Sequence, residues 1–191
     1  MTPCVPPAVA SVLDSPILAA DGAATTLRSQ LHGGPLAVVF VRHFGCIFCR
    51  ERTAQLCARK GEFEQRAVRV VLVGPGAPDK AARFALRHGC GFPVFTDPTL
   101  GVQKNAGLRR GRWSTLRLRA LVNLVRALRS GFRQTAVEGD AWQQGGALLF
   151  DGDGRLRHAQ VDRVAGDPLD LDRLLASLPA DGPRAADHTA G

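Results

Sequence analysis

Apolar residues along the chain form three short, nearly continuous runs, and segments with helical spacing lie between them. The runs cover residues 35–44, 67–74 and 92–97. Runs of this kind are typical of strands that are buried on both faces of a sheet. Residues 46–66, 75–89 and 98–108 instead carry apolar positions at helical spacing. Strands that alternate with helices predict a partly parallel sheet with right-handed crossovers.

The remaining segments complete a mixed α/β domain. Residues 14–34 are expected to form a strand or a short helix that ends in a Gly-Gly turn. Residues 144–162 predict a hairpin with a turn of type I′ at residues 151–154. A closing helix follows within residues 167–178, and Asp167 or Asp170 is available as its cap. The pattern predicts a thioredoxin-like fold over residues 16–178, a mixed central sheet flanked by helices, with a flexible arm at 1–15 and a disordered tail at 179–191.

Residues 109–133 differ from the rest of the chain because they carry eight arginines and no acid. We expect a basic helical insert whose apolar side packs inward while the arginines face solvent. The segment could also form an electropositive rim for a carboxylate or phosphate group, or attach to a membrane surface. Nothing in it resembles a nucleic-acid module, so no specific nucleic-acid partner is predicted. The residues expected to pack inward are Trp113, Leu116, Leu121, Leu124, Val125 and Leu128.

Composition sets limits on where the protein works. The net charge of +8 comes almost wholly from arginine and by itself says little about a partner. No signal peptide or apolar run of membrane-spanning length is recognisable, so a cytoplasmic location is expected. Five cysteines are an odd number and argue against a disulfide framework. Cys57 is therefore expected to be a small core residue and Cys90 a structural one, although Cys90 could also act as a distant resolving thiol, and Cys4 is expected to be incidental.

Two cysteines separated by two residues follow the first apolar run. If the strand ends near Phe44, then Cys46 lies in the turn and Cys49 lies one helical turn further on. The N-terminus of a helix favours an anion, so it lowers the pKa of a thiol placed there. Arg42 and Arg50 flank the pair and could strengthen this effect. The spacing predicts an exposed, redox-active CxxC pair in which one thiolate attacks a substrate and the other resolves the intermediate.

Two other interpretations of the cysteine pair stay open. A zinc site would need Cys46 and Cys49 together with two further ligands, but no second paired motif exists, and no metal is predicted. The pair could also be inert and buried. His43 could donate a proton to a leaving group, or it could simply pack at the end of the strand. The further zinc ligands would come from His43, Cys57, Cys90 or His32.

The segments around these residues resemble those of a known family. "RHFGCIFCRE", "FPVFTDPTLGVQKNAGL" and "QQGGALLFDGDGRLRHAQVDRVAGD" are similar, in this order, to the peroxiredoxin-like 2 proteins. These are relatives of alkyl hydroperoxide reductase and thiol-specific antioxidant, and they include prostamide/prostaglandin F synthase. The resemblance covers residues 25–178 and implies a thioredoxin fold. The proline–threonine–cysteine signature of true peroxiredoxins is lacking, because His43 and Cys46 stand where a threonine would.

The resemblance implies a thiol-dependent oxidoreductase that reduces a peroxide, endoperoxide or disulfide. Small-molecule or lipid peroxides would be the substrates, and an external thiol reductant such as thioredoxin would supply electrons, with no bound cofactor. Gly145 would let a substrate atom approach closely. A redox-switched binding protein, or a secondary-metabolism enzyme acting on a peroxide or sulfur-containing intermediate, remain alternatives. The full set of candidate residues is Cys46 and Cys49 as catalytic groups, Arg42, His43, Gly45 and Arg50 as supporting groups, and Phe44, Gln144, Gly145 and Gly146 at the substrate.

Overall fold

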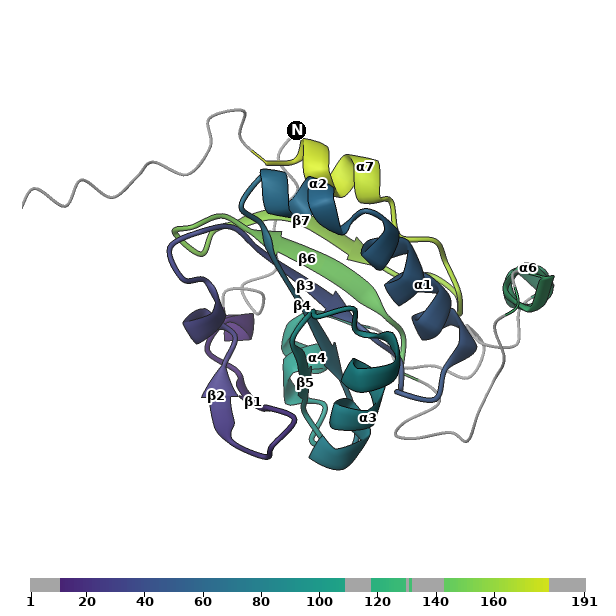
Figure 1. Ribbon diagram of the computed structural model, residues 1–191, viewed down its shortest axis with the longest axis horizontal. Helices are drawn as coiled ribbons and strands as arrows, with labels where there is room; N and C mark the ends of the chain where they lie inside the picture. Colours follow the sequence, from purple (N-terminus) through teal and green to yellow (C-terminus); the bar gives the residue numbers. More distant parts are fainter. Residues whose placement is uncertain (1–10, 109–117, 130, 132–142, 179–191) are drawn as a thin grey trace, which may run out of the picture.

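A computed structural model describes residues 11–108, 118–129, 131 and 143–178. The described residues form one mixed sheet of seven strands in the order β2-β1-β5-β4-β3-β6-β7 (Figure 1). Strands β3, β4 and β5 are parallel, whereas β6 runs antiparallel to β3 and β7 antiparallel to β6. The strands are β1 Pro16–Leu18, β2 Ala24–Thr26, β3 Leu36–Phe40, β4 Arg69–Gly74, β5 Val94–Thr96, β6 Gly146–Phe150 and β7 Leu156–Val161.

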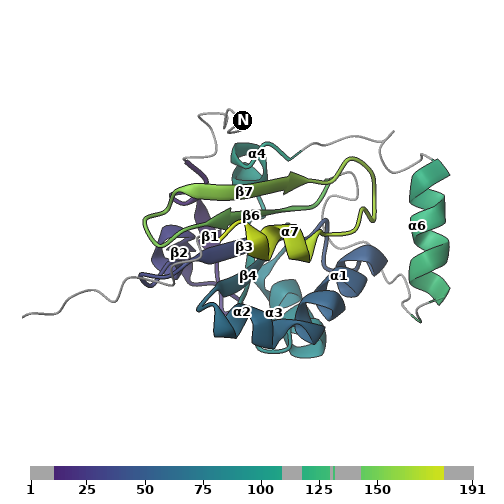
Figure 2. The same cartoon turned by 90° about the horizontal axis from the view of Figure 1, so that it is seen from above.

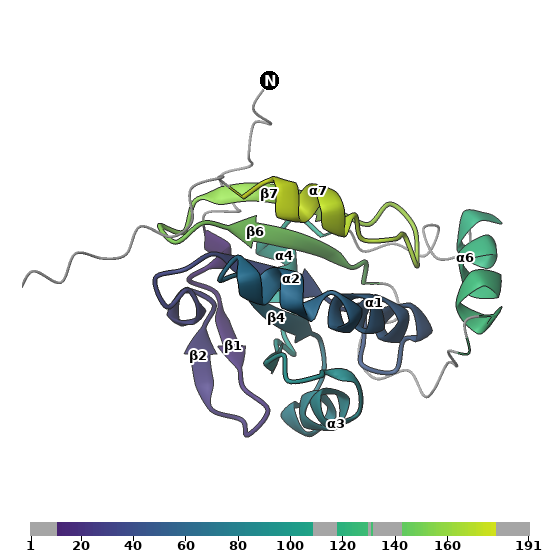
Figure 3. The same cartoon turned by 45° about the horizontal axis from the view of Figure 1, so that its top comes forward.

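Helices cover both faces of this sheet. Figure 2 shows α4 on the opposite side of the sheet from α1, α2 and α3. In Figure 3, α1, α2 and α7 lie in front of the strands. The two-sided cover explains why the central strands are apolar throughout. The helices are α1 Ile47–Ala58, α2 Lys60–Gln65, α3 Pro78–His88, α4 Gly101–Asn105, α6 Leu118–Arg129 and α7 Leu171–Ala176, with a short 3₁₀ helix, η2, at Arg28–Gln30.

Alternate residues of β3 enter two different cores, because successive side chains of a strand point to opposite faces. Ala37 and Val39 pack with the α1, α2, α3 and α7 layer. Leu36, Val38 and Phe40 pack with α4 and the N-terminal segment. All five β3 residues are buried. Strand β3 is therefore buried on both faces, as its continuous apolar run predicted.

Several expected boundaries differ from the structure. The first segment forms a two-stranded antiparallel hairpin, β1 with β2, followed by η2. Val12 and Leu13 are fully buried in the second core, so the packed domain begins before residue 16. The long helix expected over residues 46–66 is interrupted at Arg59, which separates α1 from α2. The tail at 179–191 lies outside the described residues, as do residues 1–10 of the arm.

The β6–β7 hairpin is present, but its turn is not of type I′. That type needs positive φ at both central residues, and within the turn only Gly154 has a positive φ, +79°. The Asp151 carboxylate shapes the loop instead by accepting hydrogen bonds from the N–H groups of Asp153 and Arg155. Asp170 caps α7 by accepting from the Arg173 N–H, whereas Asp167 accepts from N–H groups of the preceding loop.

Helix α6 was expected to pack its apolar side inward, and this is wrong for Val125 and Leu128, whereas Leu124 is half-buried. Val122, Val125 and Leu128 are exposed by 61%, 42% and 50%. The buried side carries Asn123 and Ala127 instead. Polar contacts hold this side against the domain, as described below. Trp113 and Leu116 lie outside the described residues, and the side chain of Leu121 is likewise not described.

In the described part of the chain, no helix has the length and apolar character that crossing a membrane requires.

Candidate active site

The loop between β3 and α1 places the two cysteines of the CxxC motif. The strand ends at Phe40, earlier than expected, and α1 begins at Ile47. Cys46 is the N-cap residue of α1, with an extended backbone (φ −73°, ψ 128°), and its carbonyl accepts from the Arg50 N–H at 3.2 Å. Cys49 lies in the first turn of the helix. The predicted position of the pair at a helix N-terminus is therefore the one observed.

Both thiols are free but buried, with exposed fractions of 1% for Cys46 and 4% for Cys49. The expectation of an exposed thiolate is wrong in this respect. A hydrogen bond from Cys49 lowers the pKa of the Cys46 thiol well below its ordinary value, against the opposing effect of burial, and His43 and Arg42 lower it further. Burial, together with the charge on Cys46, raises the pKa of Cys49 well above its ordinary value. The arrangement favours one thiolate, on Cys46, with the Cys49 thiol donating to it.

Arg42 joins the cysteines to the strand on the other side of the site. Its Nη1 lies 3.7 Å from Cys46 Sγ, and its backbone N–H donates to Cys49 Sγ at 3.1 Å. Its Nε donates to the Gln143 carbonyl at 3.0 Å. Arg42 is only 5% exposed, so its charge acts on the sulfurs with little solvent between them. Sequence reasoning named Arg42 but missed Gln143, because no local pattern reveals a contact across 101 residues.

Two other predicted supporting residues occupy different surroundings. His43 is buried beside Cys46, and both its hydrogen bond and its charge lower the Cys46 pKa. Arg50 is half-buried on α1, and its charge helps burial to lower the pKa of His88 in α3. Gly45 lies in the turn before Cys46 and is buried. The structure thus brings Arg42 and His43 to the sulfur of Cys46.

The residues predicted to contact substrate are packed against the chain itself. Phe44 is buried and lies against Phe84 of α3, with ring centroids 5.5 Å apart. A Cβ on Gly146 would lie 2.5 Å from the Gln160 carbonyl oxygen. Gln144 is fully buried. Their contact with a substrate stays a prediction that would require local opening.

A buried ion pair explains the glycine at position 145. A Cβ there would lie 2.8 Å from each of three atoms: Arg52 Nη1, Asp162 Oδ2 and the Phe40 carbonyl oxygen. Arg52 Nη2 donates to both carboxylate oxygens of Asp162 at 2.8 Å and to the Asp167 carbonyl at 2.7 Å. The space beside Gly145 is therefore filled by this pair. Sequence reasoning missed Arg52 and Asp162, since each looks like an ordinary surface charge in its own segment.

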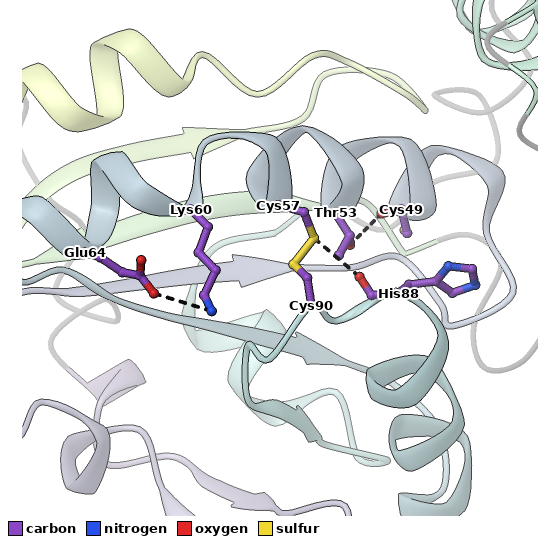
Figure 4. Close-up of a disulfide and its surroundings, with 7 residues drawn as sticks. All are labelled: Cys49, Thr53, Cys57, Lys60, Glu64, His88 and Cys90. Carbon is purple, nitrogen blue, oxygen red and sulfur yellow. Dashed lines mark hydrogen bonds and ion pairs between the residues drawn. A yellow bond between two sulfur atoms is a disulfide. The ribbon is translucent and has the colours of Figure 1, made fainter.

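Cys57 and Cys90 form a disulfide, which the sequence did not predict (Figure 4). Their Cα atoms are 6.0 Å apart, although 33 residues separate them in the chain. The bond joins the second half of α1 to the loop after α3. An odd number of cysteines does not prevent one pair from forming beside the CxxC motif.

The zinc alternative loses two of its candidate ligands to this disulfide. Within the described ranges, no group of three or more His, Cys, Asp or Glu side chains could hold a metal ion.

The comparisons with known proteins support the fold and identify the family. A family model described as AhpC/TSA antioxidant enzyme matches residues 55–163, which is more than half of the chain. The chain belongs to this family. The predicted thioredoxin-fold, peroxiredoxin-like oxidoreductase is confirmed at the level of the family.

Similar proteins carry related names. The chain is 31% identical over 147 residues to the thioredoxin-like protein AAED1, chloroplastic, of Arabidopsis thaliana, covering 72% of this chain but only 59% of the plant protein. It is 27% identical over 169 residues to human peroxiredoxin-like 2C, covering 82% and 74% of the two chains. Human prostamide/prostaglandin F synthase is 28% identical over 166 residues, covering 84% and 83%.

Solved structures show the same fold. A peroxiredoxin Q variant from Xanthomonas campestris superposes with a TM-score of 0.61 at 19% identity, over 88% of this chain and 92% of that one. Peroxidoxin BcpB from Mycobacterium tuberculosis gives a TM-score of 0.63 at 16% identity, over 85% and 90%. The predicted thioredoxin-like fold is therefore confirmed. The cytoplasmic location stays a prediction, since the name of the plant relative places that protein in a chloroplast.

Proposed function

We propose that this member of the AhpC/TSA family reduces an organic peroxide or endoperoxide, with Cys46 as the attacking group and Cys49 as the resolving group. The observation that carries the proposal is the unequal pair at the start of α1. Cys46 caps the helix and has a lowered pKa, while Cys49, one turn later, has a raised one. A thiolate is the nucleophilic form of cysteine, so the attacking role belongs to Cys46.

The reaction begins when Cys46 Sγ attacks one oxygen of the O–O bond. The S–O bond forms, the O–O bond breaks, and the departing oxygen leaves as an alkoxide that takes up a proton. Cys46 then carries a sulfenic acid, or a sulfenate ester from an endoperoxide. Cys49, after losing its proton, attacks the Cys46 sulfur, forms the disulfide, and releases water or the second hydroxyl group.

Two neighbouring groups support the first step. Arg42, fixed by Gln143, holds positive charge 3.7 Å from Cys46 Sγ and would stabilise the negative charge as it moves to the departing oxygen. His43 contacts the Cys46 sulfur and would supply the proton to the alkoxide. Both groups already lie beside the sulfur in the buried site.

An external dithiol completes the cycle by reducing the Cys46–Cys49 disulfide, and a thioredoxin-type protein is the proposed donor. No bound cofactor is required for these steps. The relatives named prostamide/prostaglandin F synthase support organic peroxides and endoperoxides as substrates. The packed rings of Phe44 and Phe84 lie near the site. They favour an apolar substrate, which could take the place of one ring against the other.

The test uses tert-butyl hydroperoxide and a thioredoxin–thioredoxin reductase–NADPH system. Cys46→Ser is expected to lose turnover, by about 100-fold or more, because no nucleophile remains. Cys49→Ser is expected to consume one equivalent of peroxide and leave a sulfenic acid on Cys46, which dimedone traps and mass spectrometry locates. Full turnover by both single variants would overturn the mechanism. A different outcome is that the wild type consumes one equivalent of peroxide and then stops, whichever dithiol is supplied. That result would favour a redox-switched binding protein.

A further inference from the structure

The Cys57–Cys90 disulfide differs from the CxxC pair in its access to solvent. Cys90 is exposed and Cys57 half-buried, whereas Cys46 and Cys49 are buried. Figure 4 shows the disulfide between the second half of α1 and the loop that follows α3. Disulfides at exposed residues are those that the thiolate of another protein most readily attacks. The mechanism proposed above makes no use of this bond.

Cys49 and Cys57 are too far apart on α1 to form a disulfide with each other. Cys49 and Cys57 are eight residues apart on α1, which places them about 12 Å apart along the helix axis. Disulfide formation needs Cα atoms within about 7 Å of each other. Thr53 lies between them on the same helix and donates to the Cys49 carbonyl at 2.8 Å (Figure 4). The influence of one centre on the other that is argued below passes through packing and not through a Cys49–Cys57 bond.

We propose that Cys57–Cys90 is a second, regulatory thiol–disulfide site, which a thioredoxin-class dithiol protein opens, and that its opening exposes Cys46. The inference goes beyond the peroxide chemistry proposed above and does not depend on the substrate.

The chemistry of opening is disulfide exchange. A thiolate of the donor attacks Cys90 Sγ, the S–S bond breaks, and Cys57 leaves as a thiolate that takes up a proton. The second thiol of the donor then attacks the mixed disulfide and releases Cys90, so the donor carries away the disulfide and the chain gains two electrons as two thiols. Lys60, whose Nζ lies 3.4 Å from the Glu64 carboxylate, also reaches to 3.5 Å from the Cβ position of Gly91, next to Cys90 in the chain. Once protonated, Cys57 Sγ is placed to donate to the His88 carbonyl, 3.6 Å away.

The loop that carries Cys90 is built to move once the bond is cut. Cys90 has a φ of +42°, a left-handed conformation that a residue with a side chain adopts at a cost. It lies between Gly89 and Gly91, and Gly91 also has a positive φ of +87°. Reduction removes the covalent link that holds Cys90 in this conformation, so the end of α3 becomes free to shift.

A shift of α3 would reach the site through two aromatic rings. Phe84 of α3 packs on Phe44, with ring centroids 5.5 Å apart, and on His88, at 5.3 Å. Phe44 lies two residues before Cys46 in the loop between β3 and α1, and both are buried in the same core. Loss of the Phe84 contact would let this loop open and would admit a reagent to Cys46, which is only 1% exposed when the disulfide is intact.

The experiment follows alkylation of Cys46 by iodoacetamide in a Cys4→Ser/Cys49→Ser background, where Cys46 has no partner in the CxxC motif. The protein is compared with the Cys57–Cys90 bond intact and after treatment with thioredoxin, and peptide mass spectrometry reports each cysteine. We expect Cys46 to react about tenfold faster after reduction. The locally open state, in which iodoacetamide reaches the sulfur, is then more populated. The same background serves in both arms, so the intrinsic reactivity of Cys46 is held constant.

A second variant removes the disulfide permanently. Cys57→Ser/Cys90→Ser, added to the same background, is expected to show the fast rate whether or not thioredoxin is present, with circular dichroism confirming the fold. If this variant does not fold, the comparison of the two redox states still decides. An unchanged alkylation rate of Cys46 after reduction would overturn the proposal. So would a Cys57–Cys90 bond that thioredoxin does not reduce. The same holds if Cys57 and Cys90 are still found as free thiols after mild oxidation. No peroxide is used, so the outcome is independent of the activity proposed above.

Discussion

Gly145 shows how closely the chain packs beside the candidate site. The atoms around its missing Cβ are a guanidinium nitrogen, a carboxylate oxygen and a backbone carbonyl, from Arg52, Asp162 and Phe40. None is the end of a loose surface side chain, because Arg52 and Asp162 are buried and paired. The glycine is therefore needed for packing, whatever it contributes to substrate access.

Gly145→Ala should lower the free energy of unfolding by about 1–3 kcal/mol, since the added methyl group forces buried polar atoms apart. Urea unfolding followed by circular dichroism measures the change. Gly61→Ala is the matched control, because that glycine lies inside α2 with nothing within 4 Å of its Cβ position. Alanine favours a helix over glycine, so this control should be neutral or slightly stabilising. Equal effects of the two substitutions would contradict the packing argument.

Helix α1 is the element that makes the two cysteines unequal. Its N-terminus lies at Cys46, and the Cys49 thiol, held one turn later, donates to the Cys46 sulfur. The pKa of Cys46 is lowered, so its thiolate persists as the pH falls below the ordinary pKa of a thiol. The same shift contributes stability that is complete above the pKa of the unfolded thiol and is lost as the pH falls through the pKa of the folded one.

The alkylation rate of Cys46 should be maximal wherever its thiol is ionised. As the pH is lowered, this rate should therefore begin to fall at a lower pH than the alkylation rate of free cysteine. In Cys49→Ala the hydrogen bond to the thiolate is gone, so the fall in rate should move to higher pH, by about one unit or more. Stopped-flow measurement with monobromobimane across pH, with mass spectrometry to assign the site, gives both profiles. If the wild-type profile matched that of free cysteine, the thiolate assignment would be wrong.

Helix α6 shows how an element can reverse the orientation that its sequence suggests. Arg126 Nε and Nη2 each donate to one carboxylate oxygen of Glu51 on α1, at 3.0 Å. Arg126 Nη2 also donates to the Gly166 carbonyl. Asn123 donates to the Ala165 carbonyl. These polar contacts fix one side of α6 beside the first half of α1 (Figure 2), so Val122 and Leu128 face solvent.

On the scale of the whole molecule, a buried ion pair holds two layers together. Arg52 on α1 and Asp162 at the end of the β6–β7 hairpin are separated by 110 residues, and both side chains are less than a tenth exposed. Burial raises the pKa of Asp162, and the charge of Arg52 opposes this rise. Such a pair adds little net stability over an apolar pair, but removal of one partner leaves the other charge buried and unpaired.

Asp162→Asn should therefore lower the free energy of unfolding by about 3 kcal/mol. Arg52→Met combined with Asp162→Asn should recover part of the loss, because the unpaired guanidinium is then absent. Asp79→Asn, which breaks the exposed pair with Arg83, provides the control and should change stability far less. Thermal and urea unfolding of the four proteins gives the comparison. Similar losses for the buried and the exposed substitution would show that Arg52 is not held by Asp162.

The sequence by itself determined the features that depend on local pattern. The doubly buried strands, the alternation of strand and helix, and the position of Cys46 and Cys49 at a helix start all follow from the order of apolar and polar residues. Arg42 and His43 were also found. They lie in the same loop as Cys46, only a few residues away, so sequence proximity alone places them near its sulfur.

The tertiary structure alone decided which distant residues meet. The Cys57–Cys90 bond, the Arg52–Asp162 pair and the contact of Arg42 with Gln143 join segments that are 33, 110 and 101 residues apart. Burial of both motif sulfurs and the outward apolar side of α6 have the same origin. A residue's own segment fixes its helix or strand through local sterics and spacing, but its partner, and with it its charge and exposure, is chosen only when the layers pack.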